Sequence, residues 1–288
     1  MPNTLPDSSV IRCTQHPGKT DSKTLEPIDQ FLLILPKRVP TALWRRIPQG
    51  SKLQALLKKR PAGDLPALET RLANKRQTRV VAGKIEPGAA AFAKLTFARK
   101  LVSAATGEKA GCLGIAVLGF EPEEEEALYQ AAVAAALAAS FNLPAFKSKP
   151  APPRIRSLRI IGGARKYDFD RTMAEARGNN LARWFTALPP NILNATSYAA
   201  ALKDLASSNN WQYKRYSTRE LEKLGAGAFL AVAQGNDDDS ASIVRLRYRP
   251  DKASAAPDVS LVGKGIIFDT GGTNLKPFLS MLDMHGDM

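Results

Sequence analysis

The sequence predicts an α/β protein with two domains joined by a long helix, and three observations support this prediction. The chain has 288 residues, which at roughly 150 residues per domain suggests about two domains. Apolar runs suited to buried strands alternate with amphipathic or alanine-rich segments suited to helices. A proline-rich stretch at 147–157 has the composition of a linker. The composition, 44% hydrophobic and 24% charged, excludes collagen-like and wholly disordered proteins.

The first sixty residues contain a polar start, one strand and one helix. Residues 1–28 are rich in Pro, Ser and Thr and poor in large apolar groups, so we expect a flexible tail. The run FLLIL at 31–35 predicts a short buried strand that stops at Pro36. Residues 51–60 predict a basic amphipathic helix with three leucines on one face.

The rest of the first half predicts four strands and a helix. Residues 79–85 and 94–102 indicate strands, the second because apolar and polar side chains alternate. The continuous apolar run at 112–120 is typical of a strand covered on both faces. Glutamates 123–126 then complement the dipole of an alanine-rich helix. One more strand, SLRIIGG at 157–163, completes the expected first domain.

A long helix at 170–188, ended by Pro189 and Pro190, opens the second half. Shorter elements follow: helices at 197–207 and 218–224, and strands at 211–216, 242–249 and 258–263. The expected organisation is therefore a tail, an N-terminal α/β domain, a linker helix and a second α/β domain, at residues 1–28, 29–165, 166–190 and 191–288 respectively.

The net charge of +14 is concentrated in the first half of the chain. Between Lys37 and Lys109 there are 17 Lys and Arg residues and only four Asp and Glu residues. Clustered cations gain from counterion release on contact with phosphates, so a nucleic-acid-binding or regulatory role for this region is one hypothesis. The other is a solvated basic face that keeps the protein in solution.

Segments for membrane insertion or secretion are not predicted. No uninterrupted apolar run approaches the ~20 residues needed to cross a bilayer. The first residues contain no basic region leading into an apolar one, as a signal peptide would. Cys13 and Cys112 are too few for a disulfide framework, so a reducing cytoplasm is the expected location.

The last thirty residues contain the candidate functional groups. The predicted strand at 258–263 runs into Lys264 and Asp269, and Lys276 and Asp287 follow within 24 positions. The end of a strand is where α/β sheets usually carry catalytic and ligand groups. Two carboxylates and two lysines here allow a divalent cation site, a weakly matched phosphate-binding loop, or a surface ion-pair network that also includes Asp283.

The stretch VGKGIIFDTGGTNLK at 262–276 resembles the signature region of the leucyl (cytosol) aminopeptidase family of dinuclear metallopeptidases. Met281, Met284 and Asp287 fall where that family has an MDxMxxDM stretch. Upstream blocks at 178–199 and 221–250 are also similar. The resemblance implies a macro-like N-terminal α/β domain, a linker helix and the first part of an aminopeptidase catalytic domain.

The resemblance also implies a role for each of these residues. Lys264 would be a metal ligand through its amine, Asp269 a carboxylate that bridges two metals, and Asp287 a further ligand. Lys276 would be the catalytic lysine that polarises the scissile carbonyl. Met284 would line the pocket for the first side chain of the substrate, although an ordinary core methionine fits it equally well. His285 is expected to lie on the surface or outside the ligand shell.

The family resemblance implies two Zn²⁺ or Mn²⁺ ions, a bicarbonate, peptide substrates with leucine-like first residues, and a hexamer. A second metal-binding motif of the NTDAEGR type, which carries the arginine that holds the bicarbonate, does not occur in the 288 residues. We therefore expect a truncated aminopeptidase that is inactive as it stands. Nucleic-acid binding by the basic N-terminal domain remains the alternative function.

Overall fold

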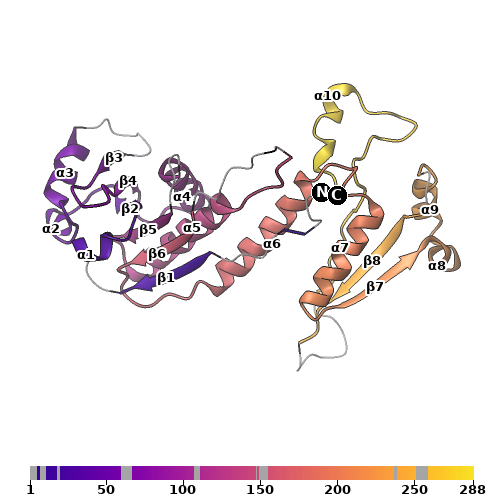
Figure 1. Cartoon of the computed structure of the whole chain (residues 1–288), viewed down its shortest axis with the longest axis horizontal. Coiled ribbons are helices and arrows are strands. Elements are labelled where there is room, and N and C mark those ends of the chain that lie inside the picture. Colours follow the sequence, from indigo (N-terminus) through magenta and orange to yellow (C-terminus); the bar gives the residue numbers. More distant parts are fainter. Residues whose placement is uncertain are drawn as a thin grey trace. The chain divides into compact units, whose positions relative to one another are not determined.

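The computed structural model divides the chain into two compact units (Figure 1). We call Ser8–Asn142 with Lys147–Asn180 the sheet unit, and Met1–Asp7, Leu143–Phe146 and Leu181–Met288 the C-terminal unit. The structure describes residues 5–6, 11–17, 20–59, 67–106, 111–146, 148, 155–236, 239–250 and 259–288. Helices and strands occur in both units, which confirms the predicted α/β class.

The sheet unit is built on a six-stranded sheet with the order β1-β6-β5-β2-β4-β3. All neighbouring strands are parallel except β3 and β4, which pair antiparallel. The strands are β1 (Arg12–His16), β2 (Gln30–Pro36), β3 (Leu68–Arg71), β4 (Arg79–Ile85), β5 (Cys112–Val117) and β6 (Ser157–Ile161). The strands predicted at 31–35, 79–85, 112–120 and 157–163 are thus confirmed as β2, β4, β5 and β6.

The central strands are buried because helices cover both faces of the sheet (Figure 1). On one face, Leu113 and Ile115 of β5 join a core with α4 (Ala91–Ala105) and α5 (Pro122–Ser140). On the other face, Ala116 of β5 joins a second core with α2 (Thr41–Trp44) and α3 (Gly50–Lys58). This burial explains the uninterrupted apolar sequence of β2 and β5.

The strand predicted at 94–102 is wrong, because these residues lie within helix α4. Its buried residues are Phe97, Ala98, Leu101, Val102 and Ala105. Their spacing has the period of a helix, whereas Leu95, which the alternation placed inside, is 48% exposed. A short alternation of apolar and polar residues was mistaken for the period of a strand.

The flexible tail predicted over residues 1–28 is also wrong for much of the part that the structure describes. Arg12–His16 pairs in parallel with β6 as an edge strand of the sheet. The side chains of Leu25, in α1 (Ser22–Leu25), and Ile28 are almost completely buried. The polar composition of β1 gave no sign of a strand, because β1 is stabilised by pairing with β6, which is distant in sequence.

The segment between α5 and β6, predicted as a linker at 147–157, lies mostly outside the described residues. The predicted long helix is confirmed as α6 (Asp170–Ala187), and the boundary between the two units falls inside it. The helix predicted at 51–60 is confirmed as α3, with Leu53 and Leu57 buried.

The C-terminal unit contains an antiparallel pair of strands, β7 (Gln212–Ser217) and β8 (Ser242–Arg247). Four helices accompany the pair: α7 (Ala195–Ser208), α8 (Thr218–Lys223), α9 (Gly227–Ala233) and α10 (Phe278–Met281). Capping boxes at Asn194 and Ser217 fix the starts of α7 and α8. The predictions for β7, β8, α7 and α8 are confirmed, whereas α9 and α10 were not predicted.

The buried strand predicted at 258–263 is wrong for the described residues 259–263, which form no strand. Val259, Leu261 and Val262 are 73%, 93% and 100% exposed. Their apolar sequence is typical of a core strand, but no described strand pairs with them. A strand needs a neighbour to bond its backbone, so its local sequence alone does not form it.

Tyr129 of α5 ties two strands of the sheet together from within the core. Its hydroxyl accepts a hydrogen bond from Val117 N (3.1 Å) and donates one to Ile161 O (2.9 Å). The residue is 0% exposed, so Tyr129→Phe leaves two backbone groups without this partner. We expect a loss of roughly 1–3 kcal/mol in the free energy of unfolding, measured by urea denaturation. Tyr216→Phe, at a half-buried position, is the control and should change it by less than about 0.5 kcal/mol.

Candidate metal centre

Lys264 and Asp269, two of the three residues predicted as metal ligands, lie in the loop that precedes α10 and contact each other there, whereas Asp287 follows α10. Lys264 Nζ donates to Asp269 Oδ2 over 2.7 Å. The lysine side chain is 59% exposed and that of the aspartate 26%. An amine and a carboxylate, five positions apart in sequence, thus meet at one point.

Lys276 also contacts Asp269, chiefly through the backbone of that residue. Its Nζ donates to the backbone oxygen of Asp269 over 2.8 Å and lies 3.7 Å from Asp269 Oδ1. The same Nζ also lies 2.8 Å from Met284 Sδ. Two of the four predicted residues therefore surround a third, and Met284 borders the group.

The turn between Asp269 and Lys276 has a backbone that requires glycine. Gly271 has φ +91°, and a Cβ there would lie 2.6 Å from Asn274 O and 3.2 Å from Lys276 Cγ. Gly271 N donates to Asp269 Oδ1 over 2.9 Å, and Lys276 N donates to Thr270 O over 2.9 Å. The close turn thus brings Lys276 back to Asp269.

Asp287 is linked to this loop through the backbone. Phe268 N donates to Asp287 O over 3.2 Å, and Phe268 has an unusual φ of +53° for a residue with a side chain. The carboxylate of Asp287 forms no ion pair with Lys264 or Lys276 in the described structure. Its charge nevertheless lies close enough to raise the pKa of Lys264.

The charges of the group reinforce each other. The hydrogen bond from Lys264 is the largest cause that lowers the pKa of Asp269, followed by the bond from Gly271 N. The hydrogen bond to Asp269 is in turn the main cause that raises the pKa of Lys264. With no metal ion bound, Lys264 is therefore a protonated cation that neutralises Asp269.

This donor set fits a divalent cation. Two carboxylates, Asp269 and Asp287, stabilise the positive charge of the Lys264 ammonium. A hard divalent cation requires negatively charged oxygen groups of this kind. The Lys264 amine can ligate only as the neutral base, so a bound cation must displace its proton. Among the described residues, no group of three or more His, Cys, Asp or Glu side chains forms a metal site.

Neither histidine joins this group. The ring of His285 lies with Nδ1 2.9 Å from Leu282 O, at an exposed position. His16 ends β1, with its Nε2 3.4 Å from Thr14 Oγ1. Asp283 is exposed, and the ion pairs of Lys264 and Lys276 are formed with Asp269 instead.

A small apolar cluster attaches the loop to the C-terminal unit. Phe185, Leu188 and Leu193 form its buried part, and Ile267 and Met288 pack against it. Each of these two residues is adjacent to the candidate group, at the Asp269 end and after Asp287 respectively. Local packing therefore positions the ligands even though the residues before them are exposed.

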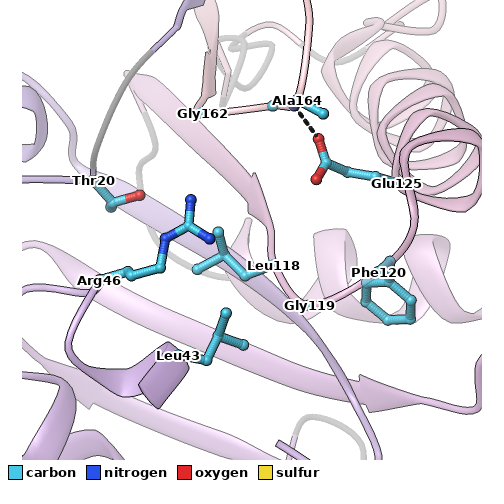
Figure 2. Close-up of a pocket in the computed structure, with 10 residues that line it drawn as sticks. Thr20, Leu43, Arg46, Leu118, Gly119, Phe120, Glu125, Gly162 and Ala164 are labelled. Atoms are coloured by element: carbon cyan, nitrogen blue, oxygen red, sulfur yellow. Dashed lines mark hydrogen bonds between the residues drawn. The ribbon is translucent and has the colours of Figure 1, made fainter. Parts of the chain in front are cut away.

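A cavity in the sheet unit, shown in Figure 2, was not predicted from the sequence. Its lining includes Gly119, after β5, and Gly162 and Gly163, after β6. Glycines directly after two buried strands are the signal that could have located it, since they often allow a backbone to approach a ligand.

Comparison with known proteins finds similarity to one family. Residues 180–288 match the catalytic domain of the cytosol aminopeptidase family. A probable cytosol aminopeptidase from Polaromonas naphthalenivorans (strain CJ2) is 33% identical over 281 residues, which cover 94% of this chain and 54% of that protein. Its counterpart from Albidiferax ferrireducens is 38% identical over 183 residues, covering 62% of this chain and 38% of that protein. The chain thus spans about half the length of these relatives or less.

Solved structures have a similar fold at low sequence identity. A leucyl aminopeptidase from Trypanosoma brucei in complex with actinonin has a TM-score of 0.72 at 20% identity, covering 98% of this chain and 57% of that one. The bottromycin maturation enzyme BotP in complex with Mn has a TM-score of 0.64 at 21% identity, covering 90% and 53% respectively. The likeness therefore extends over both units of the chain.

Replacing Gly271 should disturb the turn more than replacing its neighbour. Gly271→Ala adds both left-handed strain and a contact of 2.6 Å with Asn274 O, whereas the Cβ of Gly272→Ala (φ +69°) meets nothing within 4 Å. We expect amide hydrogen exchange at Lys276, whose N–H bonds Thr270 O, to accelerate at least about tenfold more in Gly271→Ala than in Gly272→Ala. Equal exchange rates would show that the close approach does not hold the turn.

Proposed function

We propose, on the premise that this chain belongs to the cytosol aminopeptidase family, that it forms part of a metal-dependent aminopeptidase. The observation that carries the proposal is the convergence of Lys264 and Lys276 on Asp269. All three residues lie inside the segment that matches the catalytic domain of the family. The reaction would be hydrolysis of the first peptide bond of a peptide.

Lys264, Asp269 and Asp287 would hold the metal. Asp269 Oδ2 accepts from Lys264 and Asp269 Oδ1 lies 3.7 Å from Lys276 Nζ, and the resemblance to the family would make this carboxylate the bridging ligand. A divalent cation in this position supplies Lewis-acid chemistry toward a peptide carbonyl. Three donors satisfy most of the coordination of one ion, but two ions need more ligands than these residues provide.

Lys276 would act on the substrate. Its ammonium is 29% exposed on the side chain and is anchored by Asp269 O and Met284 Sδ. An anchored cation can donate a hydrogen bond to the carbonyl oxygen of the scissile bond and stabilise the negative charge that develops there. The distance of 3.7 Å from Asp269 Oδ1 leaves Lys276 bonded to the backbone, not to the proposed bridging carboxylate.

The finer features of the proposal rest on the family and on the relatives. We propose that the ions are Zn²⁺ or Mn²⁺, since one similar structure is a complex with Mn. Met284 borders Lys276 and is the proposed wall for the first side chain, with leucine-like residues preferred. A hexamer, a bicarbonate held by residues outside these 288, and cytosolic action complete the proposal. No helix among the described residues is long and apolar enough to cross a membrane.

Nucleic-acid binding gains no support as a second function. The proteins that resemble this chain are named as peptidases or as a peptide maturation enzyme. Several of the basic residues at 37–109 are occupied in ion pairs within the sheet unit, among them Lys37 with Glu86 and Arg79 with Glu69.

Metal binding by the chain itself tests the ligand assignment. Mn²⁺ titrated into the protein should bind at one site per chain, and Asp269→Asn should weaken this binding at least about tenfold by removing a charged ligand. Asp283→Asn removes an equal charge from an exposed position nearby and is the matched control, with an expected change of less than about twofold. Equal losses in both variants would contradict the assignment of Asp269.

Hydrolysis should require more than these residues. We expect the 288-residue chain with saturating Mn²⁺ to show no turnover of leucine-p-nitroanilide, because its three candidate ligands cannot hold a two-metal site. A longer protein that contains this chain and further ligands should turn the substrate over. In that protein Lys276→Met should lower kcat at least about 100-fold, by loss of a charge-stabilising group. Robust turnover by the 288-residue chain would refute the ligand count.

A further inference from the structure

A cleft of about 460 Å³ opens at one edge of the sheet in the sheet unit (Figure 2). Its lining comes from segments that follow four parallel strands: Thr20 after β1, Leu43 and Arg46 after β2, Leu118 to Phe120 after β5, and Gly162 to Ala164 after β6. Glu125 of α5 completes it. The volume is in the range of small-molecule sites, about 300–1,000 Å³.

The topology of the sheet explains why a cleft forms there. Strands β2 and β5 are parallel neighbours, but the chain continues from β2 to β3, on one side of this pair, and from β5 to β6, on the other side. The two connections therefore diverge beyond the carboxyl ends of the strands, which is the general location of ligand sites in open α/β sheets. Gly119, with φ +86°, makes the turn after β5, where a Cβ would lie 3.0 Å from Leu43 Cδ2.

One side of the cleft has hydrogen-bond donors without protein partners. Arg46 and Thr20 both point into the space in Figure 2, and neither side chain has a hydrogen bond or ion pair with another described residue. Thr20 is only 5% exposed. A ligand oxygen in the cleft would give this hydroxyl a hydrogen-bond partner.

The other side has a carboxylate without a counter-ion. Glu125 is 8% exposed, and its Oε1 accepts from Ala164 N (2.8 Å) and Tyr167 Oη (2.6 Å). Burial and then the bond to Glu125 raise the pKa of Tyr167 to about 12, so the phenol remains a donor. The other carboxylate oxygen is directed toward the cleft in Figure 2.

The adjacent glutamates show that Glu125 is different. Glu124 pairs with Lys94 over 3.1 Å, and Glu126 pairs with Arg165 over 2.6 Å. Glu125 has no such cation among the described residues, and it forms no ion pair with Arg46 across the cleft. Buried charges in proteins are normally paired, so a ligand that supplies a cation would give Glu125 a partner. The guanidinium of Arg46, an exposed residue on the opposite wall, is available for the anion of the same ligand.

We propose that this cleft binds a free α-amino acid with an apolar side chain. Its carboxylate would bond Arg46 and Thr20, its ammonium would bond Glu125, and its side chain would lie against Leu43 and Leu118. The assignment rests on this chain's own residues. The proposed aminopeptidase reaction would release molecules of this class, so the cleft in the sheet unit would bind a product of that reaction.

Calorimetric titration of L-leucine into the 288-residue chain, with EDTA present, tests the proposal. We expect saturable binding in the millimolar range or tighter, weakened roughly tenfold by Arg46→Gln through loss of a charge-assisted hydrogen bond. Arg45→Gln is the matched control, since Arg45 is the adjacent exposed arginine and does not line the cleft, and it should leave the affinity within about twofold. Thermal melting establishes that each variant is folded.

Two further arms test the two charges separately. 4-Methylpentanoate lacks the ammonium and 3-methylbutylamine lacks the carboxylate, and each should bind at least about tenfold more weakly than L-leucine. Glu125→Gln keeps an acceptor for Ala164 N and Tyr167 Oη but removes the charge, so it should weaken leucine roughly tenfold and leave 4-methylpentanoate unchanged.

The proposal would be overturned by no saturable binding of leucine, by equal losses of leucine affinity in the Arg45 and Arg46 variants, or by equal affinity for leucine and 4-methylpentanoate. Leucine binding that disappears in Asp269→Asn would also overturn it, by locating the ligand at the metal centre. Because EDTA is present and no peptide is hydrolysed, failure here leaves the aminopeptidase proposal standing, and the reverse also holds.

Discussion

The candidate metal centre depends on the hydrogen bonds that the side chain and the backbone carbonyl of Asp269 accept. One residue accepts hydrogen bonds from Lys264 Nζ, Gly271 N and Lys276 Nζ. Each bond uses a different oxygen: Oδ2, Oδ1 and the backbone carbonyl in turn. These hydrogen bonds therefore fix the turn, the two lysines and the aspartate relative to one another, which is the preorganisation that a charged site needs.

Lys264 has to serve two states of this centre. As a protonated group it neutralises Asp269, and as a neutral amine it would be a ligand. The cation that binds must compete with a proton held by the charges of Asp269 and Asp287. Under the proposed assignment, this competition would couple metal occupancy to the loss of one proton.

The sequence predicted some of these features and missed others for identifiable reasons. The buried strands β2 and β5 and the helix α5 were predictable because their apolar runs, glutamates and alanines act locally. Two predictions failed in opposite ways: Arg12–His16 was expected to be a tail and is a strand, and residues 259–263 were expected to be a strand and are not. The reason is the same, since pairing with a partner strand decides whether a segment is a strand. The spacing from Lys264 to Asp287 identified the candidate centre, but only the structure shows that Lys276 bonds the backbone of Asp269.

The basic residues of the sheet unit have different roles. Arg76 pairs with Asp29, Arg79 with Glu69 and Lys94 with Glu124, so these cations stabilise the fold locally. Arg46 has no such partner among the described residues and points into a cleft whose opposite wall carries Glu125. A polyanion would contact many exposed cations at once and would be repelled by a buried carboxylate. A small ligand with one positive and one negative charge could bind both Glu125 and Arg46, on the two walls of the cleft. Position, more than the excess of +14, therefore determines what a basic residue in this chain can bind.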